Sequence, residues 1–295
     1  MSRTIFQGAG TALITPMKAD FSVNEDKLVQ LIHYQIDHHA DALVIAGTTG
    51  EGSTLTTEEY QTVLLRTVKE TGGRIPVIAG AGSNNTAHAV ELSKLAEDCG
   101  ADGLLHITPY YNKTSQKGLV AHFSACAKAT NLPIILYNIP SRTGVNIKPE
   151  TYLELCSLDQ IVGVKEASGD FSQLAQIKAL CKDRLDLYSG NDDQIVAVMS
   201  LGGKGVISVL SNLLPQAVHD ICQSFLDGDI KKSRMLQLNY LKLINALFWD
   251  INPVPVKQAM NQMGIDVGPC RMPLWEMEQE TLLRLQKLLQ EYQLV

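Results

Sequence analysis

The sequence has 295 residues, 45% of them apolar, with a formal net charge of −6 and an isoelectric point of about 5.6. An acidic chain without a block of lysines or arginines does not have the profile of a nucleic-acid-binding protein. No stretch approaches the ~20 apolar residues of a membrane span, and residues 1–7 lack the apolar run of a signal peptide. These totals predict a soluble, cytoplasmic globular protein, either one large domain or a domain with an appendage, without nucleic-acid or membrane partners.

Cysteines and histidines give no sign of a disulfide framework or a metal site. The six cysteines are scattered and include no C-x-x-C pair: Cys99, Cys126, Cys156, Cys181, Cys222 and Cys270. This pattern predicts buried free thiols in a reducing compartment. The seven histidines form neither H-x-H nor H-E-x-x-H, so we expect no metal, with most histidines on the surface or on helix faces.

Apolar runs of strand length alternate with segments of helical periodicity as far as about residue 228. Strands are predicted at residues 8–16, 42–47, 76–81, 103–108, 133–138, 161–165, 185–190 and 205–209. Thr56 and Glu59 form a capping box that predicts the start of one intervening helix. Eight strand–helix units within ~250 residues are typical of a (β/α)8 TIM barrel of the α/β class.

The alternation stops at about Asp229. Two amphipathic helix faces follow, one with Leu236, Tyr240, Leu243 and Leu247, the other with Leu282, Leu285, Leu289 and Tyr292. Between them, the prolines of residues 252–257 (NPVPVK) indicate a helix start. We therefore predict a barrel domain at residues 1–228 and a C-terminal helical appendage at residues 229–295.

Barrel enzymes carry their active sites at the C-terminal ends of the strands. The polar candidates that end or follow a predicted strand all fall on that rim: Thr48, Thr49, Tyr110, Tyr111, Tyr137, Arg142, Lys165, Gly190 and Asn191. By contrast, the glycine-rich residues 202–205 (GGKG) precede the eighth strand. We expect them on the opposite face, where they are no phosphate site.

Lys165 ends the apolar strand at residues 161–164. Burial disfavours a charged ammonium and lowers the pKa of a lysine. The neutral amine can then attack a carbonyl carbon and form a Schiff base. Taken alone, the lysine has an ordinary alternative, in which it reaches solvent or pairs with Glu166.

Four neighbouring candidates suit the same chemistry. Tyr137 and Lys165 each hold the fifth position of adjacent strands ~4.8 Å apart, which brings a phenol within reach of an imine-forming amine. Hydroxyls and turn amides of Thr48 and Thr49 suit a small carboxylate, and Arg142 suits bidentate carboxylate binding. The alternatives are a core tyrosine, a hydrogen-bonded turn and a solvated loop arginine.

Several motifs, in their order along the chain, resemble the dihydrodipicolinate synthase family, part of the pyruvate-aldolase superfamily that includes N-acetylneuraminate lyase. They are GTTGE (47–51), PYYNK (109–113), YNIPSRTG (137–144), GVKEASG (163–169), YSGND (188–192), GVISV (205–209) and NPVPVK (252–257). The likeness spans essentially the whole chain. GTTGE and the lysine strand are shared across the superfamily. SRTG is more specific to the synthase family, in which its arginine binds the carboxylate of the second substrate.

The resemblance implies a reaction. Lys165 forms an imine with pyruvate, and the derived enamine attacks L-aspartate 4-semialdehyde. Transimination then releases 4-hydroxy-tetrahydrodipicolinate, in the first committed step of the diaminopimelate and lysine pathway. Because the lysine itself acts as the electron sink, no metal or organic cofactor is implied.

The same resemblance implies the residue roles. Tyr137, Thr49 and Tyr111 form a proton relay, with Tyr111 donated by the neighbouring subunit of a tight dimer. Thr48 and Thr49 hold the pyruvate carboxylate, and Arg142 anchors the semialdehyde. The remaining site residues, which line the pocket, are Gly190, Asn191 and Ile207. The implied assembly is a homotetramer made of two tight dimers.

One group of residues departs from the family pattern. Family members inhibited by lysine bind it at the dimer interface with an acidic residue and a histidine, beside an asparagine and a tyrosine. Here Asn84 and Tyr110 match, but His88 stands at the acidic position and Tyr60 at the histidine position. Losing a carboxylate that pairs with an ammonium weakens binding. We therefore expect weak inhibition by lysine, or none.

Two other functions compete with the synthase. An N-acetylneuraminate or 2-keto-3-deoxy-sugar acid lyase would use the same imine for cleavage, but would favour a less cationic loop than one with Arg142. A non-catalytic barrel that binds a keto acid would be expected to lose Lys165, Tyr137 or Thr49, and this chain retains all three. The sequence favours the synthase.

Overall fold

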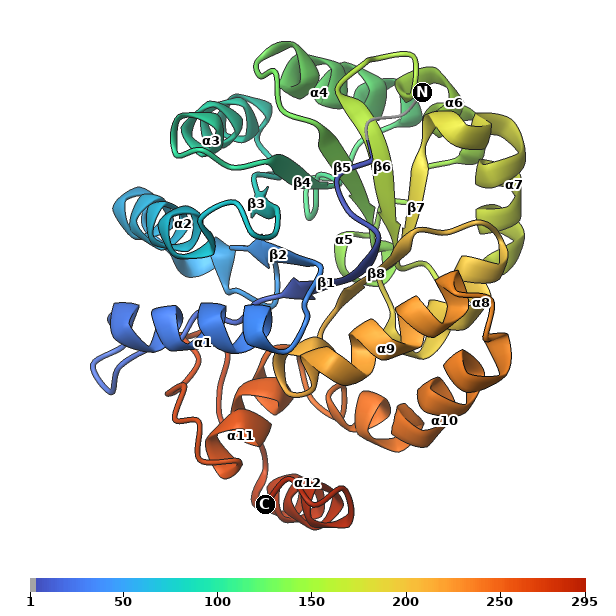
Figure 1. The fold of residues 1–295 in the computed structure, drawn as a ribbon. Helices are drawn as coiled ribbons and strands as arrows, with labels where there is room; N and C mark the ends of the chain where they lie inside the picture. Colours follow the sequence, from blue (N-terminus) through green and yellow to red (C-terminus); the bar gives the residue numbers. More distant parts are fainter. Residues whose placement is uncertain (1–3) are drawn as a thin grey trace.

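The computed structural model describes residues 4–295. Its eight strands are parallel and close into a barrel in chain order, with β1 also pairing with β8 (Figure 1). The strands are β1 Gly8–Ala12, β2 Ala42–Ile45, β3 Val77–Gly80, β4 Gly103–Ile107, β5 Ile134–Asn138, β6 Ile161–Glu166, β7 Asp186–Ser189 and β8 Gly205–Ser208. The predicted (β/α)8 barrel is confirmed.

Helices surround the barrel (Figure 1). They are α1 Glu25–Asp37, α2 Thr57–Thr71, α3 Thr86–Asp98, α4 Gln116–Lys128, α5 Pro140–Thr143, α6 Pro149–Leu155, α7 Phe171–Cys181, α8 Ile195–Ser200 and α9 Pro215–Leu226. The predicted capping box is present: the Thr56 hydroxyl accepts from the Glu59 amide, and the Glu59 carboxylate accepts from the Thr56 amide. The short helix α5 lies inside the loop after β5 and carries Arg142.

Three helices follow the barrel: α10 Ile230–Ala246, α11 Val254–Gln262 and α12 Gln279–Glu291. Figure 1 shows them gathered on one side of the molecule. Their segment is tied to the barrel by a buried ion pair, in which Lys257 Nζ lies 2.8 Å from Glu51 Oε1 and 3.0 Å from the Thr15 carbonyl oxygen. The division into residues 1–228 and 229–295 stays a prediction.

The core has two layers. Inside the barrel, Phe6 stacks on Tyr188 with ring centroids 4.5 Å apart, and the Tyr188 hydroxyl donates to the Phe6 carbonyl. Val44, Ile78 and Ile135 pack in the same interior cluster. The larger layer lies between the strands and the helices. Five cysteines are buried free thiols as expected, but Cys270 is only partly buried.

Within residues 4–295, no helix has both the length and the apolar character needed to cross a membrane.

Candidate active site

Tyr137 and Lys165 are paired directly across β5 and β6. Both side chains point into the barrel mouth and are only 6% exposed. Burial lowers the pKa of Lys165 to about 8; the Asp192 carboxylate opposes this shift and the Arg142 guanidinium adds to it. A lysine with so low a pKa holds a substantial neutral fraction near pH 8, which makes it a nucleophile.

Glu166 does not neutralise Lys165. Successive strand residues face opposite sides of a sheet. Glu166 accordingly turns outward, where its carboxylate accepts hydrogen bonds from Asn138 Nδ2 at 3.0 Å and from the Ser168 amide at 2.8 Å. Since Lys165 is also buried, both ordinary alternatives for this lysine are wrong.

The two threonines after β2 point to different partners. Thr48 lines the same cavity as Tyr137. Burial raises the pKa of the Tyr137 phenol to about 12, although the Arg142 guanidinium and the nearby Thr48 hydroxyl oppose this shift. Thr49 Oγ1 instead accepts from Asn252 Nδ2 at 3.0 Å. The resemblance places Thr49 in the relay with Tyr137. In this chain the hydroxyl that acts on the pKa of Tyr137 belongs to Thr48.

A small cavity brings most of the predicted site residues together. Those lining it are Thr48, Thr49, Tyr137, Arg142, Lys165, Gly190 and Asn191. Gly190 is required there, because a Cβ at this position would lie 2.7 Å from the Ala167 Cβ and 3.3 Å from the Lys165 Cε. The glycine lets the backbone after β7 approach the lysine closely.

Two predicted residues lie elsewhere. Ile207 is fully buried in the barrel interior and does not line the cavity, whereas Val209 does. Tyr111 is 91% exposed, with a backbone φ of 67°, and lies outside the lining of its own chain's cavity.

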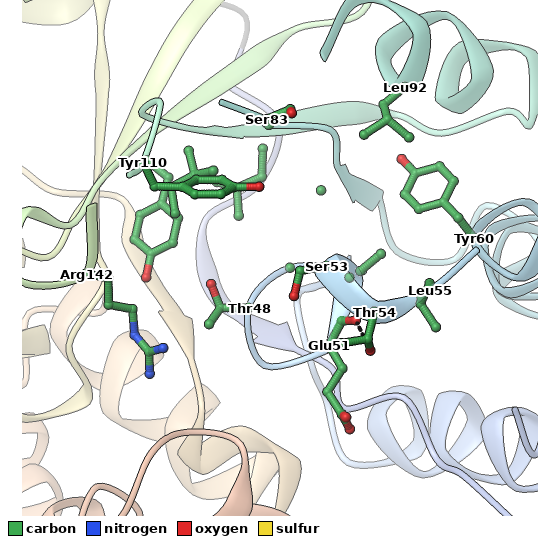
Figure 2. Close-up of a pocket in the computed structure, with 18 of the residues that line it drawn as sticks. Thr48, Glu51, Ser53, Thr54, Leu55, Tyr60, Ser83, Leu92, Tyr110 and Arg142 are labelled. Carbon is green, nitrogen blue, oxygen red and sulfur yellow. Dashed lines mark hydrogen bonds between the residues drawn. The ribbon is translucent and has the colours of Figure 1, made fainter. Parts of the chain in front are cut away.

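A larger cavity of about 430 Å³ adjoins the site. Figure 2 shows Thr48 and Arg142 at one end of it and Tyr60 and Leu92 at the other. Tyr110 and His88 also line it, while Asn84 lines a neighbouring hollow. Three of the four residues expected at an effector cleft therefore share one cavity.

Several residues at the site were also missed from the sequence, among them Phe248, Asn252 and Asp192. Phe248 and Asn252 line the lysine cavity from beyond the barrel. Asp192 is buried, and its Oδ2 accepts from the Val209 amide at 2.9 Å and the Leu210 amide at 3.0 Å. The positions of two of them in the sequence could have indicated a role, because Asp192 lies in the YSGND motif and Asn252 begins NPVPVK.

The histidines are dispersed. His106 departs from the expectation, because it is fully buried in β4, where burial lowers its pKa to about 3. In the described part of the chain, no three His, Cys, Asp or Glu side chains come together as a possible metal site.

Comparison with known proteins agrees with this geometry. The model of the dihydrodipicolinate synthetase family matches residues 5–292. The chain belongs to this family. A family member from Clostridium tetani, named 4-hydroxy-tetrahydrodipicolinate synthase, is 54% identical, with 99% of each chain covered.

Solved structures of the dihydrodipicolinate synthetase family match the fold closely. A chloride-inhibited dihydrodipicolinate synthase from Acinetobacter baumannii, complexed with pyruvate, has a TM-score of 0.96 at 38% identity and covers 99% of this chain and 100% of its own. The enzyme from Cyanidioschyzon merolae, solved with lysine bound, has a TM-score of 0.96 at 37% identity with the same coverage.

Proposed function

We propose that this protein is a 4-hydroxy-tetrahydrodipicolinate synthase, which condenses pyruvate with L-aspartate 4-semialdehyde. The observation that carries the proposal is the buried Lys165, its pKa lowered to about 8, paired across the strands with Tyr137. Family membership over nearly the full length supports it. The reaction is the first committed step of the diaminopimelate and lysine pathway. We place it in the cytoplasm, because free buried thiols suit a reducing compartment.

The chemistry begins at the neutral amine. Lys165 Nζ attacks the carbonyl carbon of pyruvate, and the tetrahedral adduct loses its oxygen as water to leave a protonated imine. Loss of a methyl proton gives the enamine, whose carbon attacks the aldehyde carbon of the semialdehyde. The amine of the semialdehyde then displaces Lys165 from the imine, which closes the ring and regenerates the enzyme.

The side chains around Lys165 transfer protons and bind the two substrates. Tyr137 passes protons to and from the adduct oxygen, and the nearby Thr48 hydroxyl is the next member of the relay. The turn amides and hydroxyls at Thr48 and Thr49 hold the pyruvate carboxylate. Arg142, exposed at the mouth, binds the carboxylate of the semialdehyde in a bidentate manner.

The exposed Tyr111 supports an assembly in which two chains share their sites. We place its ring in the active site of a neighbouring subunit, where it completes the relay. A tight dimer is the smallest unit that satisfies this arrangement, and two such dimers form the homotetramer expected from the family resemblance.

The larger cavity supports weak lysine inhibition. His88 stands at the position of the acidic residue, and its Nδ1 lies 3.5 Å from Glu91 Oε2, at the surface. A histidine cannot offer the carboxylate that an ammonium needs in a partly buried cleft, so affinity for lysine falls several-fold to about a hundredfold. Titrating the enzyme with lysine tests this, and inhibition in the micromolar range would refute it.

The direct test of the proposed chemistry is reduction with borohydride in the presence of pyruvate. We expect a covalent adduct on Lys165, located by peptide mass spectrometry. An adduct on another lysine, or none at all, would contradict the proposal.

A further inference from the structure

Asn252 reaches the active site from outside the barrel. It lies between α10 and α11, is 6% exposed and lines the cavity that contains Lys165. Its side-chain amide Nδ2 donates to Thr49 Oγ1 at 3.0 Å. Its main-chain oxygen accepts from Arg142 Nη2 at 3.3 Å. Asn252 thus contacts both Thr49, which is proposed to bind the carboxylate of pyruvate, and Arg142, which is proposed to bind the carboxylate of the semialdehyde.

The hydrogen bond to Thr49 has a direction, and the direction matters chemically. A hydroxyl has one proton to donate and two lone pairs that accept. The Asn252 N–H occupies a lone pair of Thr49, which leaves the Thr49 proton free for another acceptor. A pyruvate carboxylate can only accept hydrogen bonds. The Asn252 amide therefore orients Thr49 as a donor toward an anionic substrate.

Without the Asn252 side-chain amide, the Thr49 hydroxyl could donate its proton to other acceptors. Threonine side chains readily donate to nearby backbone carbonyls, and the Thr49 turn is rich in them. Thr54, five residues on, does so: its hydroxyl donates to the Glu51 carbonyl at 3.0 Å. If the Thr49 hydroxyl donated to a loop carbonyl in this way, it could not donate to the substrate.

We propose that Asn252 is a positioning residue for the pyruvate half of the reaction, holding the Thr49 hydroxyl so that its proton faces the carboxylate of pyruvate. This inference rests on the proposed function. It makes the segment between α10 and α11 part of the substrate site.

The two contacts of Asn252 predict an asymmetric effect of substitution. The bond to Arg142 uses the main-chain oxygen, which a side-chain substitution leaves in place. Removing the side-chain amide should therefore weaken the handling of pyruvate and spare that of the semialdehyde. A general loosening of the active site would affect both substrates.

The experiment measures kcat/KM for each substrate in Asn252→Ala. Loss of one buried hydrogen bond should lower kcat/KM for pyruvate about three- to tenfold, and kcat/KM for the semialdehyde by less than about twofold. Thr49→Val should lower the pyruvate value at least as much, and the double variant should be no worse than Thr49→Val, because Asn252 acts on pyruvate only through the Thr49 hydroxyl.

Asn261→Ala is the matched control. It too is an asparagine of the C-terminal segment whose carboxamide is hydrogen-bonded: its oxygen accepts part-buried bonds from the Val267 amide at 2.7 Å and the Gly268 amide at 3.2 Å, but contacts no site group. It should lower Tm without a selective change for pyruvate. Should Asn252→Ala not fold, Asn252→Leu keeps a similar volume and removes the donor without adding a charge, with the same selective loss expected.

Equal losses for both substrates, or full additivity in the double variant, would overturn the role of Asn252. These outcomes are separable from failure of the proposed function, in which the unmodified protein would form no pyruvate adduct on borohydride reduction.

Discussion

Lys165 and Tyr137 are cross-strand neighbours, and the lysine Nζ lies 4.4 Å from the centroid of the tyrosine ring. This register holds an amine and a phenol in contact at the mouth of the barrel, while Asp192 is a buried carboxylate within electrostatic range of the amine. The charge state of Lys165 follows from that environment.

The first prediction concerns pH. Only the neutral amine attacks pyruvate, so the initial rate of adduct formation should rise with pH through about 8 and level off above it. Because the Asp192 carboxylate raises the pKa of Lys165, Asp192→Asn should move the midpoint to lower pH. The measurement is the rate of borohydride-trapped pyruvate against pH. A midpoint near the ordinary lysine pKa would show that Lys165 is not desolvated.

The second prediction concerns Arg142. Loss of a charge-assisted carboxylate contact in Arg142→Ala should reduce kcat/KM for the semialdehyde by about ten- to a hundredfold. Pyruvate trapping above pH 9 should change little. Arg142→Lys, which keeps the charge but not the planar fork, should recover only part of the loss. Equal losses in trapping and in semialdehyde use would count against the assigned role.

The third prediction concerns Tyr111. Tyr111→Phe and Lys165→Ala should each be nearly inactive. Co-refolded in equal amounts, they should recover about a quarter of the unmodified activity, because half of the dimers are mixed and each mixed dimer holds one intact site. Arg142→Ala mixed with Lys165→Ala is the control: both residues belong to one chain's cavity, so mixing should restore nothing. Absence of recovery with Tyr111→Phe would place its ring outside the neighbouring site.

The fourth prediction concerns the buried ion pair between α11 and the loop after β2. Lys257→Ala leaves Glu51 buried without its cation and should lower the free energy of unfolding by about 3–5 kcal/mol. Lys242→Ala is the control, since its contact with Glu291 at 3.9 Å is exposed, and it should cost less than about 0.5 kcal/mol. Denaturant unfolding measures both. Similar losses would mean that Glu51 is not left as an uncompensated buried charge when Lys257 is removed.

Sequence patterns were sufficient to predict the barrel and the placement of Lys165 and Tyr137, because both depend on local regularities. Short apolar runs make strands, and residues at the same strand position become neighbours once parallel strands pair. The pocket residues Gly190 and Asn191 also followed from the rule that sites lie at strand ends.

Asn252 and the Lys257–Glu51 pair could not be predicted in this way. Asn252 meets Thr49 across 203 positions of sequence, and Lys257 meets Glu51 across 206. Such contacts depend on how the C-terminal helices pack against the rim, which no local periodicity encodes. The different partners of Thr48 and Thr49 could not be predicted for the same reason, because Asn252, the partner of Thr49, lies beyond the barrel.

We propose that the Lys165–Tyr137 pair serves condensation of pyruvate with a small amino-acid aldehyde. The most direct measurement is pyruvate consumption by the purified protein with L-aspartate 4-semialdehyde, beside a parallel reaction with N-acetylmannosamine. We predict turnover with the semialdehyde alone. Turnover with the sugar alone would retain Lys165 as the nucleophile but contradict the substrate and the role of Arg142.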